Sequence, residues 1–79
     1  MNIITDLQKQ MIDAVGHEVS VHMKNGSETL YNPFTGKCVA FTQAIDNIPE
    51  VDSICIQMEN ASCIYELMGP DIMKIEIND

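Results

Sequence analysis

The sequence predicts a mainly β protein in which an N-terminal α-helix is followed by a strongly bent five-stranded antiparallel sheet. Apolar residues recur at helical spacing near the N-terminus, and from about residue 17 onward they alternate with polar residues. Glycine, proline and asparagine interrupt the alternation at short intervals, which is typical of turns between short strands. The 79 residues are expected to form a single domain, 1–79, with the helix at about 5–15 and the sheet at about 17–77.

Residues 5–15 have the pattern of one amphipathic helix. Leu7, Met11, Ala14 and Val15 are spaced to lie on one face, and polar residues separate them. Gly16 follows directly and is placed to end the helix in a left-handed conformation. We expect this helix to cover the open end of the sheet with its apolar face inward.

Five strands are expected after the helix, at residues 18–24, 27–31 with a continuation at 37–42, 53–59, 62–68 and 72–77. Asn25-Gly26 predicts a tight type I′ hairpin between the first two, because both residues tolerate positive φ. The second strand is expected to bend at Pro33 and Gly36, and residues 43–51 are expected to form a loop. In each expected strand, the alternation places a set of apolar residues on one face of the sheet. The sets are Val19, Val21 and Met23; Val39 and Phe41; Ile54, Ile56 and Met58; Cys63, Tyr65 and Leu67; and Met73, Ile75 and Ile77.

The charge of the chain is its most unusual property. Twelve acidic residues and four lysines, with no arginine, give a net charge of −8. The four separated lysines form no basic patch in the sequence, which is unfavourable for binding nucleic acid, since affinity depends on neutralised phosphates. The acidic surface either keeps the protein soluble or binds basic proteins.

The residue patterns favour no enzyme, no catalytic residue, no metal site and no cofactor. Three cysteines without a C-x-x-C pair can form neither a disulfide framework nor a zinc site within one chain. There is no glycine-rich phosphate loop and no recognisable frame of serine, histidine and aspartate. Asp46, Glu50 and Asp52 would suit a hard cation, but a solvated loop is the simpler expectation.

The location is expected to be cytoplasmic, without a membrane partner. No segment approaches the run of about 20 apolar residues that spans a bilayer. The first residues also lack the basic start and the apolar stretch of a secretory signal.

The order of the elements resembles that of small barrels of the SH3 or Sm type, and two motifs resemble those of the Sm-like family. In that family the first motif runs from a Lys-Asn-Gly turn to a glycine, an apolar residue and Asp-x-x-Met-Asn. The second motif reads Ile-Arg-Gly-x-Asn-Ile-x-x-Ile. With an insertion in the second strand, the first motif is matched by Lys24-Asn25-Gly26, Gly36, Phe41, Thr42, Ile45 and Asp46. Residues 67–75, Leu-Met-Gly-Pro-Asp-Ile-Met-Lys-Ile, keep the apolar frame and the glycine of the second.

The resemblance implies a base-binding site formed by the two motifs. Sm-like proteins hold the base with a motif-one Asp and Asn, an aromatic or histidine between them, and the motif-two arginine. The corresponding positions here are Thr42, Asp46, Ala44 and Met68, which supply neither a stacking ring nor a guanidinium. Losing a base–aromatic stack removes about 1–3 kcal/mol per base. The candidate nucleic-acid-binding residues are Thr42, Gln43, Asp46, Asn47, Met68 and Gly69.

The resemblance also implies a homo-oligomeric ring, in which the strand at 62–68 of one copy pairs with the strand at 72–77 of the next. Two functions are then open. The first is a non-catalytic ring that binds single-stranded nucleic acid, RNA above all, in RNA or DNA processing. The alternative is an acidic protein-interaction ring or adaptor that binds a basic partner and no nucleic acid.

Overall fold

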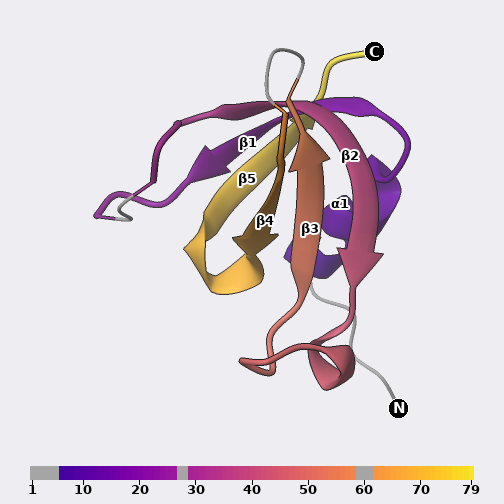
Figure 1. Ribbon diagram of the computed structural model, residues 1–79, viewed down its shortest axis with the longest axis vertical. Coiled ribbons are helices and arrows are strands. Elements are labelled where there is room, and N and C mark those ends of the chain that lie inside the picture. The colour runs from indigo at the N-terminus through magenta and orange to yellow at the C-terminus, as the bar shows by residue number, and fades with distance from the viewer. Residues whose placement is uncertain (1–5, 27–28, 59–61) are drawn as a thin grey trace.

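The computed structural model describes residues 6–26, 29–58 and 62–79 (Figure 1). It confirms the predicted class, because one N-terminal helix is followed by five strands that form one antiparallel sheet. The elements are α1 (Asp6–Ala14), β1 (Glu18–Met23), β2 (Phe34–Thr42), the 3-10 turn η1 (Ala44–Asp46), β3 (Ser53–Gln57), β4 (Ile64–Met68), the 3-10 turn η2 (Gly69–Asp71) and β5 (Ile72–Ile77). Within these described ranges, no helix is long and apolar enough to cross a membrane.

The strands lie in the order β4-β3-β2-β1-β5, so β4 and β5 are the two edges of the sheet. β2 is the longest strand and pairs with its two neighbours along different parts of its length. Residues 34–37 face β1, and residues 37–42 face β3. In Figure 1, β2 enters from the side of β1, passes over the top of the molecule and descends beside β3. The bend of the sheet is therefore a bend of β2.

Gly36 lies where β2 passes the end of β3. A Cβ atom at this position would lie 2.4 Å from the carbonyl oxygen of Gln57 and 2.9 Å from the Cα of Met58. Contacts this short are sterically forbidden, so only glycine allows the two backbones to approach this closely. Pro33, the other expected bend position, lies just before β2 rather than within a strand.

The predicted tight hairpin at Asn25-Gly26 is wrong. β1 ends at Met23, β2 begins only at Phe34, and residues 29–31 are not in a strand, while 27–28 lie outside the described residues. A type I′ turn needs positive φ at both central positions. Gly26 has a φ of 89°, but no non-glycine residue among those described has a positive φ. The side chain of Asn32 replaces the expected strand partner: Oδ1 accepts from the Met23 amide at 3.0 Å, and Nδ2 donates to the Met23 carbonyl at 3.4 Å.

α1 and all five strands contribute to one core, which contains Met11, Ala14, Val19, Val21, Met23, Phe34, Cys38, Ile54, Ile56, Leu67 and Ile72. Met11 and Ala14 are fully buried and Leu7 packs against the cluster, which agrees with the predicted inward face of the helix. The prediction is wrong for Val15, which is exposed. The helix ends at Ala14 and the chain turns at Gly16, whose φ is 91°, so Val15 leaves the helical face.

Two register shifts change the faces that alternation predicts. One lies in β2, where Cys38 is buried and Val39 is exposed, so Phe41 faces the core without Val39. The other lies between β1 and β5, where Ile72 is buried and Met73 is exposed. A β-bulge adds one residue to one strand, so the side chains beyond it point to the other face. The first and third strands keep the predicted alternation.

Replacing Gly36 by alanine is expected to lower the free energy of unfolding by about 1–3 kcal/mol. The added Cβ would meet backbone atoms of β3, which cannot rotate away as a side chain would. Urea unfolding followed by circular dichroism measures the effect. Lys37→Ala is the control, because it alters the next, exposed position of β2 without adding an atom against β3. Equal stability of the two variants would contradict the close approach of β2 and β3.

Candidate functional site

A cleft of about 340 Å³ lies between α1, the loop at 43–52 and the turn after β4. Leu7, Met11 and Val51 give it apolar walls, and Lys24 and Asp52 are the charged residues among those that line it. Met11 also belongs to the core, so the floor of the cleft is continuous with the interior. Segments from four distant parts of the sequence therefore meet here.

Asp52 connects the loop at 43–52 to the turn after β4 through hydrogen bonds. Its side-chain Oδ1 accepts a hydrogen bond from the Ala44 amide at 2.9 Å. Its backbone carbonyl accepts one from the Gly69 amide at 2.7 Å. A Cβ atom on Gly69 would lie 3.1 Å from that carbonyl, so glycine suits this contact. The sequence contained no signal for this role, since Asp52 appeared only as one acidic loop residue among several.

Three of the candidate nucleic-acid-binding residues gather around the buried Ser53. Thr42 and Met68 are its cross-strand partners in β2 and β4. The Asn47 amide nitrogen donates to Ser53 Oγ at 2.8 Å and to the Val51 carbonyl at 2.8 Å. These side chains are at least partly buried, so they support the site more than they present a surface.

The other three candidates are placed differently. Gly69 lines the cleft, but it is buried and its amide is taken by Asp52. Gln43 and Asp46 are exposed at the two ends of η1, and the Asp46 amide donates to the Gln43 carbonyl at 2.9 Å. Of the six predicted residues, these two alone present exposed side chains beside the cleft.

The surroundings of the cleft are acidic. Asp52 lines it, and Asp6, Asp46 and Asp71 belong to the elements that carry the lining residues Leu7, Ala44 and Pro70. Lys24 is the opposing charge, and it takes part in no ion pair between residues of the described ranges. Carboxylates near the cleft are expected to repel phosphate at a distance, while an ammonium without an ion-pair partner among the described residues offers it one contact point.

Three aromatic rings form a cluster that alternation did not reveal. The Phe34 and Tyr65 ring centroids are 5.5 Å apart, and the half-exposed Tyr31 meets each of them edge-on at 5.6 and 5.9 Å. A hydrogen bond to Cys63 is the main cause that raises the pKa of Tyr65 to about 12. Tyr65 is near the start of β4 and Met68 is at its end, so no ring of this cluster lines the cleft.

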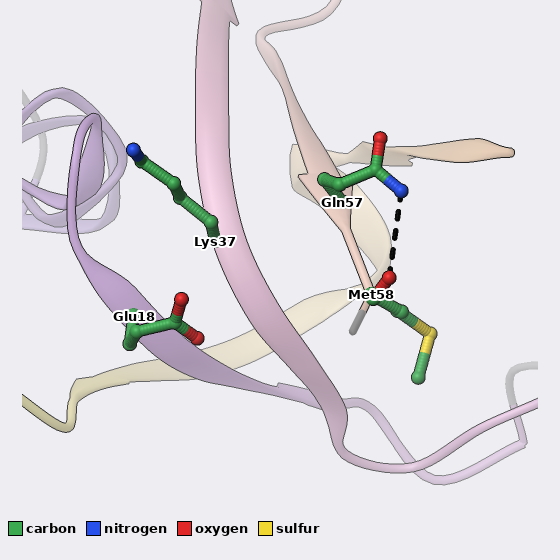
Figure 2. A pocket seen from close by; sticks show the side chains of 4 residues that line it. All are labelled: Glu18, Lys37, Gln57 and Met58. Carbon is green, nitrogen blue, oxygen red and sulfur yellow. Dashed lines mark hydrogen bonds between the residues drawn. The ribbon is translucent and has the colours of Figure 1, made fainter. Parts of the chain in front are cut away.

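A second cavity of about 440 Å³ lies at the other end of β3 and is lined by Glu18, Lys37, Gln57 and Met58 (Figure 2). Glu18 and Lys37 are cross-strand partners, but their charged ends point apart. Gln57 Nε2 donates to the Met58 carbonyl at 3.4 Å. One carboxylate and one ammonium line this cavity, as Asp52 and Lys24 line the cleft beside α1, so the lining charges balance in both.

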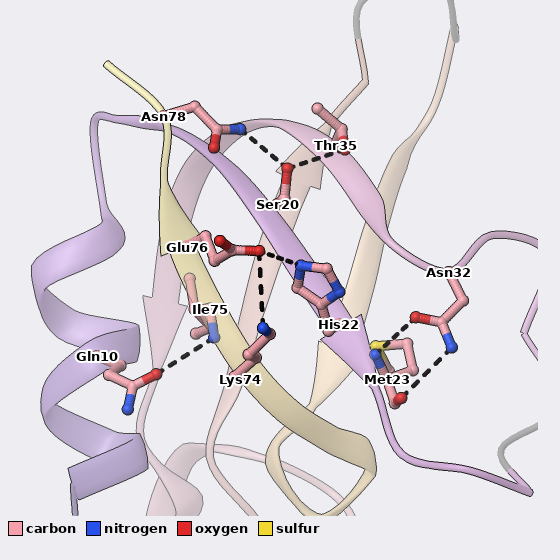
Figure 3. A network of polar contacts seen from close by, with 10 residues as sticks. All are labelled: Gln10, Ser20, His22, Met23, Asn32, Thr35, Lys74, Ile75, Glu76 and Asn78. Carbon is pink, nitrogen blue, oxygen red and sulfur yellow. Dashed lines mark hydrogen bonds and ion pairs between the residues drawn. The ribbon is translucent and has the colours of Figure 1, made fainter.

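Both histidines are bound to carboxylates rather than grouped as metal ligands. His22 shares a hydrogen bond with Glu76 on the outer face of β1 and β5 (Figure 3), and His17 Nδ1 lies 2.8 Å from Asp79 Oδ1. Nearby, Ser20 Oγ lies 3.1 Å from Thr35 Oγ1 on the same face. Within residues 6–26, 29–58 and 62–79, no group of three or more metal-ligating side chains is present.

The thiols at Cys38 and Cys55 are poor nucleophiles at neutral pH. Burial raises the pKa of both, and for Cys55 the neighbouring Glu66 carboxylate raises it further. Since the thiolate is the reactive form, these two cysteines act as small packing groups.

The contact between Asp79 and His17 is expected to make stability depend on acid pH. Its hydrogen bonds to His17 and to the Glu18 amide lower the pKa of Asp79 in the folded protein. The contribution is therefore complete above the pKa of the unfolded chain and is lost as the pH falls through the lower, folded value. Urea unfolding from about pH 6 to about pH 2 should show less loss of stability for Asp79→Asn than for the parent protein. Asp13→Asn, which instead removes an exposed carboxylate of α1, should follow the parent profile.

No family model matches this chain, and neither a curated protein nor a solved structure matches it. The resemblance to Sm-like proteins therefore remains a matter of the two motif frames and the order of the elements.

Proposed function

We propose that this protein is an Sm-like subunit that self-assembles through its edge strands and binds single-stranded nucleic acid without catalysing a reaction. The observation that carries the proposal is the strand order, in which β4 and β5 lie at opposite edges of one bent sheet. Each edge has a free side, and the two sides belong to different strands. A contact between unlike edges repeats from copy to copy and closes into a ring when the rotation allows it.

The side chains of the two edges support assembly. Ile64 in β4 is 55% exposed, and Met73 and Ile77 in β5 are 55% and 47% exposed. Exposed apolar edge strands tend to pair with other chains, and proteins usually cover or charge them. A chain of this size buries a modest share of its surface on folding, so pairing with a second copy would add burial that one copy lacks.

Static light scattering tests this assembly. The parent protein is expected to have a mass that is a multiple of 8.8 kDa. Ile64→Lys should shift it toward the monomer, because a charge introduced on a paired edge strand must be desolvated. Ile48→Lys is the matched control, since Ile48 is an exposed isoleucine between η1 and β3 and belongs to neither edge strand. A parent protein that is monomeric at all concentrations would end the proposal of a ring.

The nucleic-acid part of the proposal rests on where the two loops lie. The loop at 43–52 and the turn at 69–71 hold the positions that correspond to the base-binding motifs, and Asp52 joins them at one end of the sheet. Lys24 lines the cleft beside them and has no ion-pair partner among the residues that the structure describes. Gln43 offers an exposed amide that can pair with a base edge.

A second function is favoured by the charge. With Asp52 lining the apolar cleft, three further aspartates on the elements that form it, and a net charge of −8, the surface complements a basic protein segment better than a phosphate backbone. An adaptor of this kind would use the same assembly. The two functions differ in the ligand, so binding experiments separate them.

Fluorescence anisotropy with U-rich and A-rich oligonucleotides at low salt tests the first function. Lys24→Gln is expected to weaken binding and to reduce the slope of log K against log salt by about one unit. Lys9→Gln, at an exposed helix position outside the cleft, should leave the affinity nearly unchanged. Absence of binding at tens of micromolar, together with binding of a leucine- and lysine-containing peptide that Asp71→Asn weakens, would favour the adaptor.

A further inference from the structure

The free side of β5 is already engaged at one point by a side chain of α1. The backbone amide of Ile75 donates to Gln10 Oε1 at 3.2 Å (Figure 3). In an antiparallel ladder each residue directs its amide and carbonyl to the same side, and the sides alternate along the strand. The Asn78 amide donates to the Glu18 carbonyl at 2.8 Å, so the pair of Glu18 and Asn78 is a hydrogen-bonded one. Ile75 is paired with Val21, three positions further along, and therefore directs its amide away from β1.

The position of Gln10 is fixed by its neighbours, although its side chain is exposed. Met11 and Ala14 are fully buried in the core, which anchors the helix against the sheet. The anchored backbone brings the Gln10 amide group to the outer edge of β5, as Figure 3 shows. Its side-chain oxygen occupies the place that a carbonyl of an added strand would take.

We propose that Gln10 is a detachable cap on the β5 edge, which competes with β4 of a second copy for the amide of Ile75. This inference rests on the proposed assembly through β4 and β5. A second copy is the fitting occupant, because β4 is the other free edge of the sheet and is one residue shorter than β5. On the outer face, β4 carries Glu66 and β5 carries Lys74, which are complementary in charge.

The competition weakens assembly by a limited amount. A neutral hydrogen bond at an exposed position contributes little net free energy, because water replaces it. Breaking it before a strand can pair should therefore raise the dissociation constant of the assembly by about two- to tenfold. Gln10→Ala removes this obstacle at a position where alanine also suits the helix.

The test combines two measurements on the full chain. Sedimentation velocity over a concentration series is expected to give a dissociation constant about two- to tenfold lower for Gln10→Ala than for the parent. Amide hydrogen exchange by NMR, at a concentration where the protein is dissociated, should show faster exchange at Ile75 in Gln10→Ala. Lys9→Ala, at the neighbouring exposed helix residue, is the control for exchange and should leave the exchange rate at Ile75 unchanged.

Gln10→Glu gives the opposite change. A carboxylate accepts a stronger hydrogen bond than an amide, so exchange at Ile75 should slow and assembly should weaken. Lys9→Gln also makes the net charge one unit more negative, so it corrects for general repulsion between copies. Assembly must weaken more in Gln10→Glu than in Lys9→Gln.

The outcomes separate this inference from the proposed function. Unchanged exchange at Ile75 in Gln10→Ala would show that Gln10 caps nothing. Faster exchange with unchanged or weaker assembly would overturn the competition, while the assembly itself would stand. A monomer at all concentrations, in the parent and in every variant, would overturn the assembly and with it the competition.

Discussion

The close approach of Gly36 to the end of β3 is the contact on which the rest of the fold depends. Because no side chain separates the two backbones there, β2 can turn from β1 to β3 within one continuous strand. The turn brings Phe34 at the start of β2 within ring contact of Tyr65 in β4, although β3 lies between these two strands. A flatter β2 would separate these rings and open the core.

The same bend decides which parts of the chain remain available. It leaves β4 and β5 as edges, and it places the loop at 43–52 next to the turn after β4. Asp52 connects these two segments, because its side chain accepts a hydrogen bond from Ala44 in the loop and its backbone carbonyl accepts one from Gly69 in the turn. The candidate site is therefore a consequence of the bent sheet and of the two hydrogen bonds that Asp52 accepts.

The sequence predicts well those features that depend on local periodicity. The helix face with Met11, and the alternation of Val19, Val21 and Met23, follow from spacing alone and are confirmed by burial. The edges could also be predicted, because the family resemblance assigns an order to the strands. The hairpin could not, because Asn32 holds the end of β1 from a distance of nine residues, and Asn25-Gly26 gives a strong local signal for a different turn.

Features that depend on contacts distant in sequence had no local signal. The bulges that expose Val39 and Met73 arise from strand pairing, and the role of Asp52 appears only when loop and turn lie together. The aromatic cluster likewise joins residues on both sides of the loop at 43–52. The candidate site residues lie in or next to the loop at 43–52 and the turn at 69–71, where Asn47 and Gly69 use their polar groups to hold these segments together.

The charge of the chain and its apolar edges act in opposite directions on assembly. A net charge of −8 on each copy repels other copies, but salt screens charges that lie more than about 8 Å apart at physiological ionic strength. The charged residues of the two edges are Glu66, Lys74 and Glu76, so most of the negative charge lies outside the strands that would pair. Strand pairing is short-ranged and directional, and it can therefore proceed at edges where the repulsion is weak. Two copies would therefore repel each other through their acidic surfaces outside β4 and β5, and the repulsion would be weakest where these two edge strands can pair.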